Sequence, residues 1–401
     1  MLKGLKVIEY GQFVSAPFCT KLMADMGAEV IKIEPPGKGD AARDYGPFPG
    51  DEPHRERSGL FLFLNQNKLG ITLDVEKSEG RKILFNLLKE SDVFVMNYPR
   101  KNISELGLDY SVPTPINPSL IYCSISPFGW EGPYRDLPGS NIHCCALSGA
   151  GWSIGSPDRE PLEIPMHQGD YQAGINGASA IMVALLHRHR KGRGQQIDIS
   201  ASDVMATYAG TNAILYLFYG LKWYRAGRRA YGSGGPYPYG IFPCKDGYVC
   251  LIARTPQDWD LLIKAVGNPE WSNHPRYRDQ IAMGREYPDE VDSLLIPILK
   301  RYTQAELFEM ARKWGFPMAP VRTVADTLKE PHLAGRNLFG SVEHQATGRL
   351  TFLRPPYQYS NYDPKPVSPA PLFGEHNDLV YGERLGFSRE KIQKLREDRI
   401  I

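Results

Sequence analysis

The sequence lacks the glycine-rich motifs that bind nucleotide phosphates. The first predicted turn from strand to helix, residues 11–17, contains no G-x-G-x-x-G pattern, and Gly149, Gly151 and Gly155 have the wrong spacing for one. A Walker A sequence, G-x-x-x-x-G-K-[ST], does not occur either. We therefore expect neither a bound dinucleotide nor a nucleoside triphosphate.

Paired cysteines, an excess of one charge and long apolar runs are missing too. The six cysteines show no CxxC spacing, which argues against a zinc site or a redox dithiol. With 47 basic and 45 acidic residues the net charge is +2, so neither nucleic acid nor an acidic membrane surface is an expected partner. No apolar run approaches the roughly 18 residues that span a bilayer. We expect a cytoplasmic protein that binds no metal and no permanent prosthetic group.

What the sequence does contain is a regular alternation of predicted strands and helices. Residues 6–10 favour a strand, 16–26 a helix and 28–34 a second strand. The alternation continues through strands at 70–75, 92–97 and 119–126, with a helix at 77–90. This order predicts an α/β fold with a mostly parallel sheet covered by helices, and 401 residues are enough for two domains.

The composition changes between residues 221 and 248. Basic and aromatic side chains alternate there, and Gly232-Ser233-Gly234-Gly235-Pro236 follows. This stretch is typical either of a plain linker between domains or of a glycine lid that closes over a reacting centre. A hairpin at residues 239–251 and helices at 257–266, 290–302 and 305–314 predict a smaller second domain.

Asp170 is the residue with the clearest chemical potential. It follows Gly169 at the front of an amphipathic helical pattern, residues 171–189. Aspartate is a favoured helix N-cap, and a carboxylate at a helix N-terminus is also suited to act as a nucleophile. The local pattern leaves both interpretations open.

Along its whole length the chain resembles the class III CoA-transferases, which include formyl-CoA:oxalate, carnitine and bile-acid CoA-transferases. Each matching segment is short, but their order and spacing together are specific. The segments that carry the resemblance are Leu5-Lys6-Val7-Ile8-Glu9, Gly27-Ala28-Glu29-Val30, Gly39-Asp40, Asn65-Gln66-Asn67-Lys68, Asp92-Val93-Phe94-Val95-Met96-Asn97-Tyr98, Gly169-Asp170, Gly192-Arg193-Gly194-Gln195 and Gly374-Glu375-His376.

The resemblance implies a fold and an assembly. It implies a Rossmann-like large domain that begins with residues 1–220, a smaller α+β domain at 221–330 with the lid at its start, and a C-terminal segment, 331–401, that returns to the large domain. Two chains would form an interlocked dimer, either of identical subunits or with a paralogous partner. A half-active subunit that needs such a partner is an alternative function.

The resemblance also assigns residues. Asp170 would be the nucleophile that attacks an acyl-CoA and forms mixed anhydride and aspartyl-CoA thioester intermediates. The CoA thioester is then a substrate, and Gly232, Ser233, Gly234 and Gly235 form the lid, which Ser233 interrupts. The predicted CoA-binding residues are Asn97, Tyr98, Arg100, Lys101, Arg43, Val14 and Ser15; solvated surface cations are the alternative for Arg100 and Lys101.

One position departs from the family pattern. Some members stabilise the developing oxyanion with a glutamine in the first turn, where this chain has Val14, and Gln12 lies two residues earlier. We expect backbone N–H groups near Ser15, or in the lid, to replace it.

Racemisation of acyl-CoA is the alternative within the same fold. It would use Asp170 with a histidine on the opposite face of the substrate, in a Gly-His-Asp context. This chain has Ser140 at that position, with His143 three residues later. For transfer, family analogy suggests succinyl-CoA as the donor, and aromatic residues around the lid suggest a bulky or aromatic carboxylic acid as acceptor.

Overall fold

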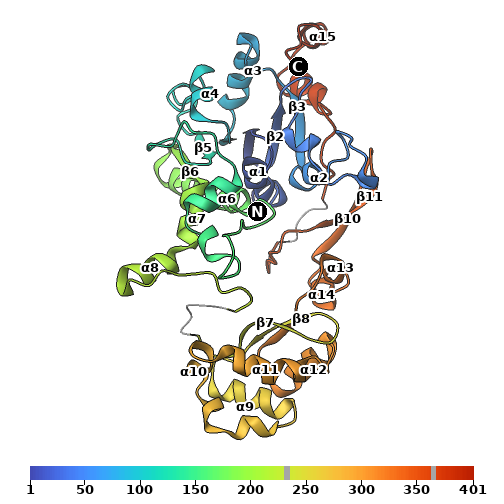
Figure 1. Cartoon of the computed structure of the whole chain (residues 1–401). Helices are drawn as coiled ribbons and strands as arrows, with labels where there is room; N and C mark the ends of the chain where they lie inside the picture. Colours follow the sequence, from blue (N-terminus) through green and yellow to red (C-terminus); the bar gives the residue numbers. More distant parts are fainter. Residues whose placement is uncertain (230–234, 363–366) are drawn as a thin grey trace. The chain divides into compact units, whose positions relative to one another are not determined.

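A computed structural model describes residues 1–229, 235–362 and 367–401 of the protein. The chain divides into two compact units. Unit 1 comprises Met1–Ser148, Ile164–Tyr208 and Ala334–Ile401, and unit 2 comprises Gly149–Glu163 and Ala209–Leu333 (Figure 1). The domain boundaries expected near residues 220 and 330 stay a prediction.

Unit 1 is built on a six-stranded sheet whose neighbouring strands are all parallel. Its strands are β1 (Lys6–Tyr10), β2 (Glu29–Glu34), β3 (Lys68–Thr72), β4 (Val93–Met96), β5 (Ile121–Ser126) and β6 (Gln196–Ser200). Their order is β3-β2-β1-β4-β5-β6, which is the Rossmann order. The direction of strand progression reverses between β1 and β4, and ligands of such sheets bind beyond the carboxyl ends of the strands at that point.

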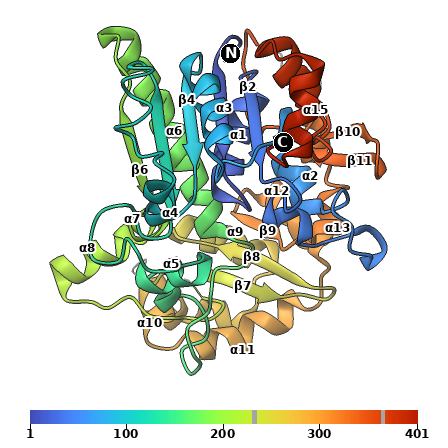
Figure 2. The same ribbon diagram turned by 90° about the horizontal axis from the view of Figure 1, so that it is seen from above.

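Helices cover both faces of this sheet (Figure 2). Helices α1 (Ser15–Asp25) and α6 (Gln168–Lys191) pack on the face that carries Val7, Val93 and Val95. Helices α3 (Ser78–Lys89), α4 (Arg100–Glu105) and α15 (Arg389–Glu397) pack on the other face, which carries Ile8, Phe94 and Met96. Shorter helices of unit 1 are α2 (Gly59–Leu64), α5 (Asn141–Leu147) and α7 (Ala201–Tyr208). The predicted α/β fold with a parallel sheet is confirmed.

Glycines let α6 approach α1 closely. A Cβ added at Gly174 would lie 2.7 Å from the carbonyl oxygen of Ser15, and one at Gly177 would lie 3.3 Å from Sγ of Cys19, both in α1. Larger residues at either position would push the helices apart. This packing brings the second turn of α6 to the first turn of α1.

The C-terminal part of the chain covers β3, the edge strand of the sheet. The N–H of His376 donates to the carbonyl of Gly70 at 2.9 Å, and the N–H of Gly70 donates to Nδ1 of His376 at 3.1 Å. Asn377 and Tyr381 bind the backbone of Thr72 in the same way. The segment that follows the small sheet of β10 (Phe339–His344) and β11 (Gly348–Leu353) therefore satisfies backbone groups that an edge strand exposes.

Unit 2 contains an antiparallel sheet packed against helices. The strands are β7 (Tyr239–Pro243), β8 (Tyr248–Ile252) and β9 (Met318–Pro320), so the predicted hairpin is confirmed. The helices are α8 (Gly210–Tyr219), α9 (Pro256–Ala265), α10 (Gln280–Arg285), α11 (Pro288–Leu299), α12 (Gln304–Trp314), α13 (Val324–Thr327) and α14 (Pro331–Gly335), the last of which crosses into unit 1. Across the residues described in both units, no helix combines the length and the apolar character needed to cross a membrane.

Candidate active site

The turn between β1 and α1 lies at the switch point of the sheet, and Asn97 holds it. Asn97 follows β4 directly; its Oδ1 accepts the N–H of Gln12 at 2.9 Å. Its Nδ2 donates to the carbonyl of Gln12 at 2.7 Å and to the hydroxyl of Ser15 at 3.0 Å. A single amide side chain therefore links the carboxyl end of β4 to the start of α1.

The same turn carries a strained residue and an uncapped helix start. Phe13 adopts a left-handed φ of 64°, and its N–H donates to Oδ1 of Asp40 at 2.8 Å. Val14, the N-cap of α1, offers no side-chain hydrogen bond. The start of α1 therefore has no side-chain acceptor at its N-cap, the arrangement in which the first N–H groups of a helix can bind an anion.

A cluster of buried charged side chains from β1, β2 and β3 lies next to this turn and supports it. Glu9, Lys32 and Lys68 have fully buried side chains; Glu9 lies 2.7 Å from Nζ of Lys32 and 2.8 Å from Nζ of Lys68. Lys32 also donates to the carbonyl of Gly11 at 3.0 Å and pairs with Asp40 at 2.6 Å. Burial alone would raise the pKa of Glu9, but the two lysines lower it to about 2. The carboxylate stays ionised and fixes three strands beneath the site.

Asp170 is the third residue of α6 and does not cap the helix. The N-cap is His167, with a left-handed φ of 54°, preceded by Met166 with a φ of 64°. The interpretation of Asp170 as an N-cap, which the local pattern left open, and the predicted helix start at residue 171 are therefore wrong. The reason is a long-range contact: Asn141, the first residue of α5, accepts the N–H of Gly169 at 2.6 Å and so supplies the acceptor that a local cap would provide.

The Asp170 carboxylate is half-buried, and none of the described residues donates a hydrogen bond to it. Burial raises its pKa to about 6, although the charge of His167 acts in the opposite direction. Its charge in turn adds to the burial that raises the pKa of the Cys144 thiol to about 12. A carboxylate that is poorly solvated and unpaired retains its nucleophilicity.

Aromatic rings connect Asp170's turn to the switch-point turn. The ring of His167 makes edge contacts with Phe13 at 5.0 Å and with Tyr45 at 5.5 Å between centroids. Nε2 of His167 lies 3.3 Å from the hydroxyl of Tyr45. Sequence reasoning missed this pair because 122 residues separate its members and no local pattern marks either one.

Comparison with known proteins places the whole chain in one family. The family model described as CoA-transferase family III matches residues 2–377. This protein belongs to that family. Over 404 residues the transferase is 31% identical to succinyl-CoA–D-citramalate CoA-transferase of Chloroflexus aurantiacus, covering 100% of this chain and 98% of the relative. It is 30% identical over 406 residues to mouse succinyl-CoA:glutarate CoA-transferase, covering 98% and 88%.

Two solved structures share the fold of this chain. A CAIB/BAIF family protein from Brucella suis superposes with a TM-score of 0.85 and 31% identity, covering 95% of this chain and 98% of that one. Rv3272 of Mycobacterium tuberculosis gives a TM-score of 0.80 with 26% identity, covering 94% and 98%. The chain is an enzyme that uses CoA thioesters as substrates, and its described residues include no group of three acidic, histidine or cysteine side chains placed to bind a metal.

The predicted CoA-binding residues of this transferase divide into two groups. Asn97, Tyr98, Arg100 and Lys101 follow β4 at the carboxyl edge of the sheet. Tyr98 stacks on Tyr10 at 4.5 Å, and Arg100 donates to the carbonyl of Trp130 at 2.9 Å. The side chain of Lys101 is 75% exposed. The position of these two cations at the edge of the sheet is compatible with phosphate binding, which stays a prediction.

Arg43 and Val14 belong to the interior. Arg43 is fully buried, donates to both oxygens of Glu34 at 2.7 and 2.8 Å, pairs with Glu56 at 2.7 Å and lies 3.7 Å over the ring of Phe61. These contacts use its donors and argue against the phosphate role suggested by its position after Gly39-Asp40. The side chain of Val14 is also completely buried, which leaves only its backbone for a ligand.

The predicted lid lies mostly outside the described residues. Gly232, Ser233 and Gly234 are outside them, whereas Gly235 is described and packs so tightly that a Cβ on Gly284 would collide with its carbonyl oxygen. Within unit 2, Asp292 pairs with Arg228 and Arg229 before this segment and accepts the hydroxyl of Tyr237 after it at 2.8 Å. One carboxylate thus anchors the chain on both sides of the segment.

The residues considered for racemisation bind each other or the scaffold. The hydroxyl of Ser140 lies 3.0 Å from Nδ1 of His143, which is exposed on α5. Asn141 between them holds Gly169. His167, rather than His143, is the histidine whose charge acts on Asp170.

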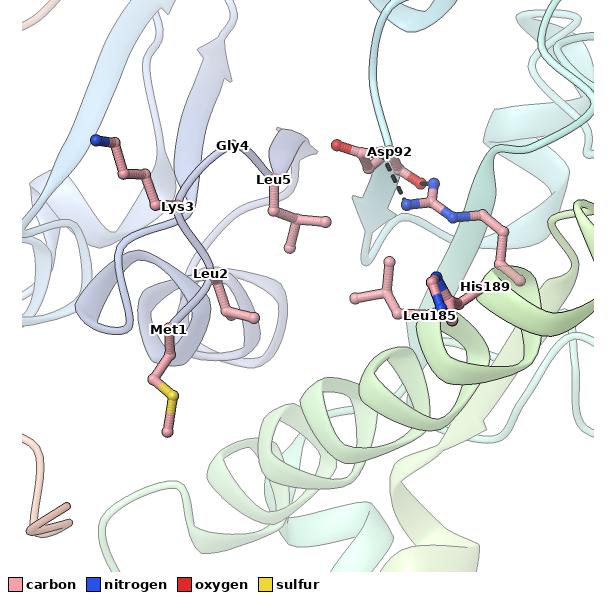
Figure 3. A pocket seen from close by; sticks show the side chains of 9 residues that line it. Met1, Leu2, Lys3, Gly4, Leu5, Asp92, Leu185 and His189 are labelled. Atoms are coloured by element: carbon pink, nitrogen blue, oxygen red, sulfur yellow. Dashed lines mark hydrogen bonds and ion pairs between the residues drawn. The ribbon is translucent and has the colours of Figure 1, made fainter. Parts of the chain in front are cut away.

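A separate pocket of about 410 Å³ lies at the amino ends of the strands of the sheet (Figure 3). It is lined by the residues that precede β1, by Asp92 before β4, and by the last turns of α6: Met1, Leu2, Lys3, Gly4, Leu5, Asp92, Leu185, Arg188 and His189. Asp92 pairs with Arg188 at 2.8 Å. Because it lies at the amino ends of β1 and β4, this pocket is remote from Asp170.

Proposed function

We propose that this transferase moves CoA from a dicarboxylic acyl-CoA such as succinyl-CoA to a carboxylic acid, through covalent intermediates on Asp170. The observation that carries the proposal is the half-buried Asp170 carboxylate, with a pKa raised to about 6 and no hydrogen-bond donor among the described residues. The relatives support the donor, since their names describe succinyl-CoA transfer to citramalate and glutarate.

In the first half of the reaction, a carboxylate oxygen of Asp170 attacks the thioester carbonyl carbon. The C–S bond breaks, CoA leaves as a thiolate, and a mixed anhydride forms on Asp170. The thiolate then attacks the Asp170 carbonyl carbon, the donor leaves as a free carboxylate, and an aspartyl-CoA thioester remains. The energy of the thioester is conserved at each exchange.

In the second half, the acceptor carboxylate attacks the aspartyl-CoA carbonyl carbon and releases the thiolate again. The thiolate attacks the acyl carbon of the acceptor in the new anhydride, which yields the acyl-CoA product and regenerates the Asp170 carboxylate. Water would hydrolyse either anhydride, so the site must exclude it.

The N–H groups of Ser15 and Ala16 stabilise the oxyanion of each tetrahedral intermediate. They stand at the uncapped start of α1, and Gly174 of α6 packs directly on the carbonyl of Ser15. Preorganised backbone donors of this kind replace the glutamine found in some family members. Asn97 holds their turn in place through three hydrogen bonds.

The carboxylic acid acceptor is bulky or aromatic, as the aromatic residues near the lid suggest. Of these residues, Tyr237 is buried and binds Asp292, and Tyr224 binds the carbonyl of Pro157 at 2.9 Å. Both pack within unit 2. The exposed members of the group, Tyr216, Phe218 and Tyr219, lie on α8.

The protein functions as an interlocked dimer, of identical chains or with a paralogue. Helix α8 exposes Leu217, Phe218 and Tyr219 by 76%, 77% and 73%, and monomeric proteins seldom expose such contiguous apolar surface. Two relatives are named as the alpha and beta subunits of succinyl-CoA–L-malate CoA-transferase, which motivates the paired alternative. Gel filtration combined with a transfer assay distinguishes the two: a homodimer is active alone, whereas a half-active subunit gains activity only with its paralogue.

Mass spectrometry after hydroxylamine treatment tests the covalent mechanism. The protein is incubated with a panel of acyl-CoAs and then with hydroxylamine, which converts an anhydride or thioester on Asp170 to a hydroxamate. We expect the modified peptide to contain Asp170 and the adduct to require an acyl-CoA. An unmodified Asp170 with every donor, in a preparation that transfers CoA, would rule the mechanism out.

A further inference from the structure

His167 and Tyr45 form a polar pair beside Asp170 that the transfer mechanism leaves unused. Nε2 of His167 lies 3.3 Å from the hydroxyl of Tyr45, and Phe13 packs edge-on against both rings at 5.0 and 5.1 Å. His167 is half-buried, and Tyr45 is 46% exposed. The pair is therefore held in place by packing yet open to a substrate.

The pair has spare hydrogen-bond donors. A neutral imidazole has one N–H and tyrosine one O–H, and their mutual hydrogen bond uses only one of these. A protonated imidazole leaves two donors free, which match the two oxygens of a carboxylate. None of the described residues occupies the second ring nitrogen of His167, which makes no side-chain capping bond to α6.

The position of the pair also suits an anion once the reaction has begun. His167 lies three residues before Asp170, and its charge favours the ionised Asp170 carboxylate. When Asp170 becomes acylated it loses its charge. The electrostatic attraction of His167 is then available to an anionic group on the substrate.

The backbone around the pair is unusual. Phe13, Met166 and His167 are non-glycine residues with left-handed φ angles of 64°, 64° and 54°, and two of their rings are in contact. Such conformations cost free energy and cluster at functional sites. Here they aim the His167 ring at Phe13 and Tyr45 rather than along the axis of α6.

From this geometry we infer that His167 and Tyr45 bind the distal carboxylate of a dicarboxylic substrate while its reacting carboxyl group is joined to Asp170. The pair thereby selects dicarboxylic over monocarboxylic acyl-CoA donors. This inference rests on the proposed transfer at Asp170 and adds the residues that recognise the class of substrate.

The test compares succinyl-CoA with butyryl-CoA, which has the same four-carbon chain and a methyl group in place of the distal carboxylate. Formation of the Asp170 adduct is followed in single turnovers with wild type, His167→Asn and Tyr45→Phe. Asparagine tolerates the left-handed backbone, so His167→Asn removes the imidazole without imposing new strain. Loss of a charge-assisted hydrogen bond should lower the second-order rate constant of adduct formation from succinyl-CoA by roughly 10- to 100-fold. The reactions are run at pH 8, where Asp170 stays ionised with or without the charge of His167, and there butyryl-CoA should react at the wild-type rate.

Met166→Asn is the matched control, since Met166 shares the left-handed backbone but is 73% exposed and contributes no polar group. It should preserve the preference for succinyl-CoA. Tyr45→Phe removes only a hydroxyl and should reduce the preference by a smaller factor than His167→Asn.

Two results would overturn the assignment while leaving transfer at Asp170 intact. One is a wild type that reacts equally with both thioesters, and the other is an equal loss for both thioesters in His167→Asn, which would place His167 on the shared thioester carbonyl. Absence of an adduct with every acyl-CoA would refute the covalent mechanism itself and the assignment with it.

Discussion

An aspartate lies at each end of α6, and the two differ in their hydrogen bonding. At its C-terminal end Arg188 donates to Asp92 at 2.8 Å, and the N–H of Lys6 donates to the other oxygen of Asp92 at 2.7 Å. At its N-terminal end Asp170 receives no hydrogen bond from any described residue. The first carboxylate is fully satisfied at the amino edge of the sheet, whereas the second lies unsatisfied at the carboxyl edge.

The difference separates a structural carboxylate from a reactive one. Arg188 and the N–H of Lys6 each bind one oxygen of Asp92, so this side chain ties α6 to β4. Burial without pairing instead leaves the lone pairs of Asp170 exposed to an electrophile and raises its pKa. Such a group costs stability, which is a common property of catalytic sites.

The largest expected effect comes from Asp170→Asn, which keeps the shape of the side chain and removes the nucleophile. We expect CoA transfer to fall by at least about 1,000-fold. Because burial disfavours the ionised form, the variant should be as stable as wild type at pH 8 or more stable. Steady-state transfer assays and urea unfolding at pH 8 measure the two quantities. Transfer at the wild-type rate would contradict the role of Asp170.

Glu9→Gln should destabilise the support of the site. It leaves Lys32 and Lys68 buried without their shared carboxylate, which should lower the free energy of unfolding by about 3 kcal/mol or more. Lys6→Ala is the matched control, because its ion pair with Glu90 is exposed and should contribute less than about 1 kcal/mol. Denaturant unfolding measures the free energy of unfolding of both variants. Equal losses of this free energy would show that the buried ion pairs of Glu9 stabilise the fold no more than the exposed Lys6–Glu90 pair does.

The pH dependence of adduct formation should report the raised pKa of Asp170. Its folded pKa of about 6 lies above the usual value of 3.8, so the folded protein holds the proton more tightly. Acylation should therefore be constant above pH 7 and fall by about tenfold per pH unit well below pH 6. The stabilisation from this proton is complete below pH 3.8 and is lost as the pH rises through 6. Single-turnover rates between pH 4.5 and 8 test this; a rate that stays flat to pH 5 would indicate an Asp170 with an ordinary pKa.

Arg188→Ala should have the smallest effect. The Asp92–Arg188 pair is partly exposed, with 28% and 19% of the side chains accessible, and its loss should cost about 1 kcal/mol of unfolding free energy. Acylation of Asp170 at the other end of the helix should not change. A loss of acylation rate at unchanged stability would show that the two ends of α6 are coupled.

Sequence patterns predict most of the fold of unit 1 for a physical reason. Strands buried on both faces appear as continuous apolar runs, such as residues 93–96, and the intervening helices alternate with them. The start of α6 differs from the predicted one because the N–H of Gly169 in its first turn is satisfied from α5 by Asn141, 28 residues away, rather than by a neighbour. Local preferences carry no information about such an acceptor.

The residues of the candidate site also differ in whether the sequence alone predicts them. Asp170 stands in a motif and can be found from the sequence, whereas Tyr45 and His167 meet only after folding. Arg43 was a predicted CoA-binding residue, but its acidic partners, Glu34 and Glu56, lie on other segments and pair with it in the interior. Whether a cation is free or buried depends on tertiary contacts that residue order does not reveal.

The C-terminal cover of β3 has a consequence for how the protein is made. The residues that bind Gly70 and Thr72 are His376, Asn377 and Tyr381, which leave the ribosome more than 300 residues after the strand they protect. During synthesis the edge of β3 is therefore open to pairing with other nascent chains. The length of this interval should set how long the nascent chain needs protection by chaperones, and the edge of β3 is covered only after residues 376–381 have been synthesised.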